Sequence, residues 1–303
     1  MSLSVAALPM SGPSGPRPRR RFAPSRILIY AVLVFSALYY LVPLYVMIVT
    51  SLKSLAEVRE GNVFTLPRHV TFEPWIKAWL SACTGLHCEG LNVGFWNSVR
   101  ITLPAVAVST ALGCLNGYAL ANWRFRGSEF FFVVMLIAIF LPFQVLLFPL
   151  VLLTAKMGIF GTPWALIFVH SVFGMPFLTL LFRNYFAALP VELFRAARVD
   201  GAGFWSIFFR IMLPMSPPIV SVALVLQVTG IWNDFLFAVT FSSPGSYPMT
   251  LQLNNIVKTS MGVTEYNVNM AATILTGLVP LAVYFLSGKL FVRGIAAGAL
   301  SGT

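Results

Sequence analysis

Charged residues are scarce in this chain. Only 10% of its 303 residues are Asp, Glu, Lys or Arg, whereas 58% are hydrophobic. A soluble globular domain carries about 25% charged residues, which cover its water-facing surface. The composition therefore excludes an ordinary soluble protein and indicates a membrane protein.

Acidic residues are scarcer still, 9 against 20 basic residues, so the net charge is +11. The placement of the basic residues argues against nucleic-acid binding. If both termini are inside, 13 of the 20 basic residues fall in inner segments, as the positive-inside rule expects. They are Arg17, Arg19, Arg20, Arg21, Arg26, Arg124, Arg126, Arg183, Arg195, Arg198, Arg210, Lys289 and Arg293. Only three acids accompany them: Glu129, Glu192 and Asp200.

The chain has only three cysteines. Cys114 lies in a long apolar stretch and is expected to pack as a small hydrophobe. Cys83 and Cys88 fall in a predicted outer loop, where a disulfide and two free thiols are both open alternatives. Together with His87 they lack the spacing of a zinc site, so we predict no metal site.

The sequence also lacks the residue patterns of an enzyme active site. The three histidines are scattered along the chain, and no nucleophile or carboxylate pair shares a face. A phosphate loop is absent, because Gly288-Lys289 is followed by Leu290 and lacks the earlier glycine. A membrane enzyme is therefore the weaker alternative.

What the chain does have is apolar stretches long enough to cross about 30 Å of hydrocarbon as helices. The first is too long for a cleavable signal. We predict six spans, at Ile27–Val49, Ile101–Ala121, Phe130–Leu153, Trp164–Phe182, Ile219–Phe241 and Ala271–Leu290.

The connections between these spans differ in length. Residues 1–26 are rich in Pro, Gly, Ser and Arg and read as a disordered inner tail. The first outer loop, about residues 50–95, is predicted to contain short surface helices. Residues 154–163 form a tight connection, and residues 242–270 include a polar, helix-like stretch. We find no repeat at a fixed period.

Polar residues and proline occur at one depth in three spans. They are Pro142 and Gln144, then Gln227, Thr229 and Gly230, then Thr276, Gly277 and Pro280. Broken backbone at membrane depth is tolerated where protein or a water-filled cavity satisfies it. We favour a transport pathway at the midplane; ordinary hydrogen bonding between helices is the alternative.

A polar insert, residues 190–214, separates the fourth and fifth spans. Pro190 suits the first position of a helix, and Glu192 suits its first turn. Arg195 and Arg198 are predicted in the last turn, and Gly201 in the left-handed position beyond it. Two alanines, Ala196 and Ala197, leave one face without bulk. This pattern indicates a helix-turn-helix that fits a groove on a partner; a merely solvated loop is the alternative.

The stretch Arg195-Ala-Ala-Arg-Val-Asp-Gly-Ala-Gly203, with Ile211-Met-Leu-Pro214 after it, resembles the EAA loop of binding-protein-dependent ABC-transporter permeases. The order and spacing of other motifs resemble carbohydrate-importer permeases related to the second maltose permease subunit, over about residues 27–300. Within that family, the chain looks most like the glucose/mannose-type permeases. The resemblance lies in three stretches: Gly61-Asn62, the sequence of residues 204–215, and Gln252-Leu-Asn-Asn255. The other motifs are Thr50-Ser-Leu-Lys53, Phe95-Trp-Asn-Ser98, Tyr118-Ala-Leu-Ala121, Phe125-Arg-Gly127, Leu141-Pro-Phe-Gln144, Trp232-Asn-Asp-Phe235 and Phe291-Val-Arg-Gly294.

The resemblance implies an all-α polytopic protein with the type I ABC importer permease fold and a cytoplasmic coupling helix. It divides the chain into the tail 1–26, a first span with its outer loop at 27–92, a permease core at 93–290, and an inner tail at 291–303. The implied partners are a second, different permease, two ATP-binding subunits and a soluble binding protein. ATP and Mg²⁺ would bind the partner subunits, and this chain no cofactor. The implied location is the bacterial inner membrane.

One residue departs from the family pattern. Arg195 occupies the position where the EAA signature has its glutamate, which is a charge reversal. Two alternatives follow: Arg195 meets an acidic patch on the partner, or it pairs with Glu192 three residues earlier. The resemblance carries the coupling role onto eight positions: Glu192, Arg195, Ala196, Ala197, Arg198, Asp200, Gly201 and Pro214.

Sugar hydroxyls favour amide partners, and apolar sugar faces stack on rings. The predicted pathway residues are Gln144, Gln227, Trp232, Asn233 and Asn97. Asp234 joins them as an acid within a span, although it alternatively reaches the outer interface. All of these are gate or packing groups if the other permease makes the sugar contacts.

The predicted function is sugar import, glucose/mannose-type first, with maltose-like oligosaccharides or glycerol-3-phosphate as alternatives. In this hypothesis closure of the ATPase dimer moves residues 190–214 as a lever. An ion-coupled sugar carrier is less favoured, because it usually needs more ionisable groups in its spans and pseudo-symmetric halves.

Overall fold

The computed structural model describes residues 24–84, 87–123, 125–258 and 264–299. The described residues form helices, turns and one isolated bridge between Gly161 and Ser242, with no named strand. By their contacts they divide into two units, 1–46 and 47–303. The first unit contributes most of helix α1, and the second contains every other helix. The prediction of an all-α membrane fold is confirmed.

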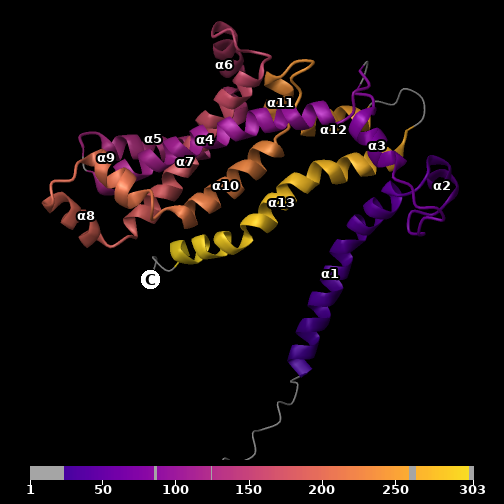
Figure 1. The fold of residues 1–303 in the computed structure, drawn as a ribbon, viewed down its shortest axis with the longest axis horizontal. Helices are drawn as coiled ribbons and strands as arrows, with labels where there is room; N and C mark the ends of the chain where they lie inside the picture. Colours follow the sequence, from indigo (N-terminus) through magenta and orange to yellow (C-terminus); the bar gives the residue numbers. More distant parts are fainter. Residues whose placement is uncertain (1–23, 85–86, 124, 259–263, 300–303) are drawn as a thin grey trace, which may run out of the picture. The chain divides into compact units, whose positions relative to one another are not determined.

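Four helices are long and apolar enough to cross a membrane by themselves. They are α1 (Pro24–Ser51), α4 (Asn92–Asn122), α7 (Pro163–Ala187) and α13 (Tyr266–Ala299) (Figure 1). Each covers one of the predicted spans. α13 runs on to Ala299, so the helix includes much of the predicted tail 291–303. The predicted tail 1–26 lies almost wholly outside the described residues.

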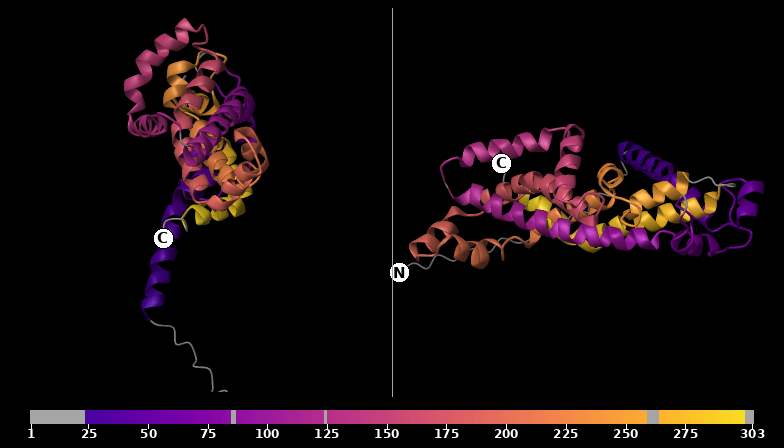
Figure 2. Two further views of the ribbon diagram at one scale, coloured as in Figure 1. Left: turned by 90° about the vertical axis from the view of Figure 1, so that its left-hand side faces the viewer. Right: turned by 90° about the horizontal axis from the view of Figure 1, so that it is seen from above.

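The third predicted span is wrong as a single helix. α5 (Ser128–Phe140) and α6 (Phe143–Lys156) meet at an angle of 103°. The turn, visible in Figure 2, falls at Leu141-Pro142, because proline lacks an N–H and forces the preceding residue into extended backbone. A second bent pair joins Phe204–Met212 to Pro217–Trp232 at 86°. The count of spans depends on these two pairs: the described helices give four, or up to six if each bent pair forms one span.

The fifth predicted span also ends early. α10 (Pro217–Trp232) stops nine residues before the predicted end at Phe241, and α11 (Leu236–Phe241) follows after a break. Asp234 lies in this break rather than inside a continuous span. The apolar run Phe235–Phe241 gave no sign of the interruption, because hydropathy does not distinguish one helix from two.

The second unit is held together by close packing of α4 against α7. Gly113 and Gly117 stand one turn apart on α4, and a Cβ at either would lie 2.5 or 2.6 Å from a Cβ of α7. Two glycines at this spacing let helix backbones approach closely in membranes. α10 in turn contacts α4, α7 and α13, so these four helices form the body of the unit.

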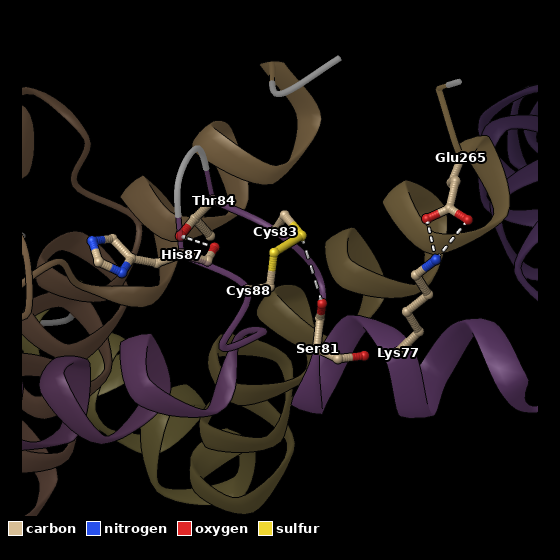
Figure 3. Close-up of a disulfide and its surroundings, with 7 residues drawn as sticks. All are labelled: Lys77, Ser81, Cys83, Thr84, His87, Cys88 and Glu265. Atoms are coloured by element: carbon tan, nitrogen blue, oxygen red, sulfur yellow. Dashed lines mark hydrogen bonds and ion pairs between the residues drawn. A yellow bond between two sulfur atoms is a disulfide. The ribbon is translucent and has the colours of Figure 1, made fainter. Parts of the chain in front are cut away.

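Short helices lie between the spans, as predicted. α2 (Leu55–Glu60) and α3 (Glu73–Leu80) occupy the first long connection, and α12 (Met249–Lys258) the last. The ion pair between Lys77 on α3 and Glu265, at 2.7 Å, fastens this region to the start of α13 (Figure 3). α12 and α3 lie at the opposite end of the second unit from α8 (Figure 1).

Candidate functional site

The polar insert folds into three short elements. They are α8 (Val191–Val199), α9 (Phe204–Ile207) and the π-helix η1 (Phe208–Met212). Pro190 precedes α8 rather than occupying its first position, and Arg198 alone is basic in the last turn. Gly201 has φ +79°, the left-handed conformation that the sequence predicts.

α8 has a buried face and a free face. Phe194 and Ala197 are buried, whereas Ala196 is exposed, so the two alanines do not share one small face as predicted. Val199 is 87% exposed. The free face also carries Val191, Glu192, Leu193, Arg195 and Ala196. An apolar and charged strip of this kind is available for contact with another protein.

An aromatic socket, formed by Tyr118, Trp123, Phe204 and Phe208, holds the insert against α4. The ring of Tyr118 lies 4.8 Å from Phe204 and 5.3 Å from Phe208. Its hydroxyl donates to the Phe204 carbonyl at 3.1 Å. Trp123 packs on Phe204 at 5.3 Å, and on Phe194 of α8 at 5.6 Å. The socket therefore joins both parts of the insert to one helix.

Other contacts fix the two ends of the insert. The guanidinium of Arg198 lies 5.0 Å from the Trp123 ring, a cation–π distance. The Tyr185 hydroxyl of α7 donates to the Met215 carbonyl at 2.6 Å, just beyond the exposed Pro214. Asp200 caps the end of α8 and is exposed. Through these contacts, a displacement of α8 would be transmitted to α4 and α7 as well as to α10.

A groove of about 260 Å³ runs between α7 and α10. Gln227, one of the predicted pathway residues, is among its polar groups. The side chain of Gln227 crosses to Gly174, where a Cβ would lie 2.4 Å from its Nε2, so a larger residue at 174 would displace the end of this side chain. The other lining residues include His170, Phe173, Phe177 and Gly230.

Sequence reasoning missed the α7 side of this groove. His170, Phe173, Gly174 and Phe177 repeat at intervals of three and four, the spacing of one helix face. That spacing was a usable signal, but an aromatic face in an apolar helix is common packing. Only the contact with Gln227 distinguishes it.

The other predicted pathway residues are not gathered in the groove. Asn97 is buried, and its Nδ2 donates to the carbonyls of Gly245 and Tyr247 at 3.0 and 3.1 Å. Trp232 is buried, and its Nε1 donates to the Thr276 carbonyl at 3.1 Å. Gln144 is exposed on α6, far along the chain from this region.

Two residues follow the end of α10. Asn233 is exposed, and Asp234 accepts from the Ala238 N–H at 3.1 Å. The Asp234 carboxylate also lies 3.8 Å from Nε2 of His170, which lines the groove. Asp234 therefore stabilises the first turn of α11, and its carboxylate lies beside the groove.

Helix α4 connects the two ends of the unit. Its Tyr118 contacts the polar insert, while its Asn97 and Ser98 hold the segment before α12. Ser98 Oγ accepts from the Met249 N–H at 2.8 Å. A displacement of the insert can therefore be transmitted along α4 to the turn at 244–247.

Cys83 and Cys88 are joined by a disulfide, which closes a short loop after α3 (Figure 3). Within the part of the chain that the structure describes, no group of three His, Cys, Asp or Glu residues could hold a metal ion.

Comparison with known proteins gives consistent matches. The family model described as "binding-protein-dependent transport system inner membrane component" matches residues 109–297. A probable ABC transporter permease of Pyrococcus horikoshii is 36% identical over 285 residues, 93% of this chain and all of that protein. The diacetylchitobiose uptake system permease of Streptomyces coelicolor is 30% identical over 94% of this chain and 89% of that protein.

A solved structure has the same fold. It is a bacterial ABC transporter involved in import of the acidic polysaccharide alginate, with a TM-score of 0.74 and 21% identity. The match covers 91% of this chain and 99% of that chain.

Proposed function

This chain belongs to the family of binding-protein-dependent transport system inner membrane components, and from that premise we propose that it is one of two permeases forming the pathway of an ATP-driven sugar importer. The family is a transport component of the membrane and not itself an ATPase. ATP and Mg²⁺ are then bound by separate subunits.

The observation that carries this proposal is the polar insert. α8 is fixed to α4 by the aromatic socket on one side and leaves a free face on the other. A rigid element of this kind can accept force from a partner and pass it to the spans. We assign the free face to an ATP-binding subunit, one for each permease.

Arg195 gives that contact a distinctive polarity. Among the described residues Glu192 and Arg195 form no ion pair, and Arg195 is exposed. This favours the alternative in which Arg195 meets an acidic group on the ATP-binding subunit. The eight coupling positions, Pro214 included, then act as one docking and hinge unit.

The groove between α7 and α10 is the proposed sugar contact of this subunit. It combines an amide, an imidazole and the rings of Phe173 and Phe177. Small-molecule sites typically pair apolar walls with a few polar groups. Glucose or mannose is our first choice of cargo, and a short oligosaccharide is the alternative, since one relative is named for diacetylchitobiose.

We infer the remaining partners from what such permeases require. A second permease completes the pathway, and a soluble binding protein delivers the sugar to the α12 end. Both termini and the polar insert would face the cytoplasm, as the positive-inside rule predicts. The membrane is the bacterial inner membrane.

Transport by the reconstituted importer tests the proposal. Labelled glucose, mannose, maltose and glycerol-3-phosphate are offered to vesicles with the binding protein outside and ATP inside. We expect ATP-dependent uptake of a hexose or a short oligosaccharide. Uptake driven by a proton gradient without ATP, or none of any sugar, would refute it.

A further inference from the structure

A second concave surface, which shares no lining residue with the groove, lies beside α12. This α12 cleft has a volume of about 690 Å³. Its walls come from four segments: the loop after α3 with Thr84, His87 and Glu89, the start of α4 with Val93, the turn with Tyr247, and α12 with Gln252 and Lys258. The volume falls within the range of about 300–1,000 Å³ typical of small-molecule sites.

The walls of the α12 cleft are fixed to one another. Gln252 is buried, and its Nε2 donates to the Gly90 carbonyl at 2.8 Å, which ties α12 to the first loop. The turn at 244–247 is held by the side chain of Asn97. The first loop is closed by the disulfide and by the Thr84 hydroxyl, which donates to the His87 carbonyl at 3.3 Å (Figure 3). The Thr84 N–H donates to the same carbonyl at 2.7 Å. The cleft is therefore preformed.

The chemistry of the cleft fits a neutral polyhydroxylated ligand. Glu89 supplies an acceptor, Lys258 a donor, and Thr84 a hydroxyl, while Tyr247 brings an aromatic ring. Because one acid and one base are present, neither an anion nor a cation is strongly favoured. Protein–protein interfaces bury about 800 Å² on each partner, and a hollow of this volume, with mixed apolar and polar walls, suits a small molecule better.

The position of the cleft relates it to the groove. Thr250 at the start of α12 donates its hydroxyl to the Trp232 carbonyl at 2.6 Å, where α10 ends. Gly230, which lines the groove, stands only two residues earlier. The cleft thus lies at the same end of α10 as the groove.

We propose that the α12 cleft binds a short neutral oligosaccharide before it enters the pathway. This proposal rests on the proposed function, and it adds a receiving site on the permease itself. Sugar released at the α12 end is retained by the cleft and passes along the end of α10 to the groove.

Sugar binding in the absence of the binding protein tests this site. The complete importer in lipid nanodiscs is titrated with maltotriose, and the Kd is measured by saturation-transfer NMR. We expect Tyr247→Ala and Lys258→Met to weaken binding by about tenfold or more, as truncation of a contacting side chain does at a binding hot spot. The control is Tyr266→Ala, an exposed tyrosine that does not line the cleft, which leaves the Kd unchanged.

The outcomes separate this proposal from the function it rests on. Unchanged binding in Tyr247→Ala, or loss of binding only in Gln227→Ala, overturns the cleft site while leaving ATP-driven uptake intact. If Tyr247→Ala weakens docking of the soluble binding protein but not of maltotriose, the cleft is a protein contact and the proposal is wrong. The melting temperature of each variant identifies any that fails to fold.

Discussion

The turn after α8 gives the sharpest test of the lever. Gly201 has φ +79°, and a Cβ built there would meet nothing within 4 Å. A substitution therefore costs only backbone strain, with no steric clash to confuse the result. Gly203, two residues later, is also surrounded by open space but has φ −79°, which any residue adopts. The same substitution at Gly203 is a matched control.

The magnitude follows from the conformation. A left-handed backbone costs an L-residue about 1–2 kcal/mol, and a β-branched one is at the upper end or beyond. A cost of about 2 kcal/mol depletes the native turn about thirtyfold relative to alternatives, because 1.4 kcal/mol is tenfold. Asparagine tolerates this region, so we expect Gly201→Asn to cost less than about 1 kcal/mol.

The assay is ATP hydrolysis by the assembled importer, with and without sugar-loaded binding protein. We expect Gly201→Val to lose most of the stimulation while the subunits still co-purify. Gly201→Asn should retain more than half of it, and Gly203→Val nearly all. Equal loss in the two valine variants, or full stimulation in Gly201→Val, would show that the left-handed turn does not orient α8.

Three further predictions test the body of the second unit. Gly117→Val should destabilise the permease, because its Cβ would lie 2.6 Å from a Cβ of α7. Gly277→Val is the control, because a Cβ there meets open space. The melting temperatures of the two variants in detergent are compared, and equal values would exclude close α4–α7 packing. Asn97→Ala should cost about 1–3 kcal/mol, since it leaves two carbonyls of the 244–247 turn without their donor. In uptake assays, Gln227→Ala should raise the KM for sugar about tenfold, because a side-chain amide that contacts the cargo loses its hydrogen bond to a polar ligand. An unchanged KM would assign Gln227 to packing.

Some features were readable from the sequence because they depend on neighbours along the chain. The four long spans follow from runs of apolar residues, and the left-handed turn follows from a glycine after a short polar helix. Both are local: hydrocarbon thickness sets the length of a span, and the missing Cβ sets the preference of Gly201.

Other features arose only from contacts between distant segments. Asn97 and Trp232 have the residue types expected for sugar contacts, yet both serve internal hydrogen bonds with segments 44 to 150 residues away. Conversely, His170 and Phe173 line a groove because α7 packs beside α10, whose Gln227 lies close to Gly174.

The sequence by itself determined that this chain crosses a membrane and carries a polar insert between two spans. Pro142 also marks, within the sequence, where the third span bends. The tertiary structure decided where the fifth span breaks, which face of α8 is free, and which polar groups line a groove. The physical reason is that hydropathy and capping act over one helical turn or one span. A side chain's availability, in contrast, depends on whether a distant backbone has already taken its hydrogen bonds.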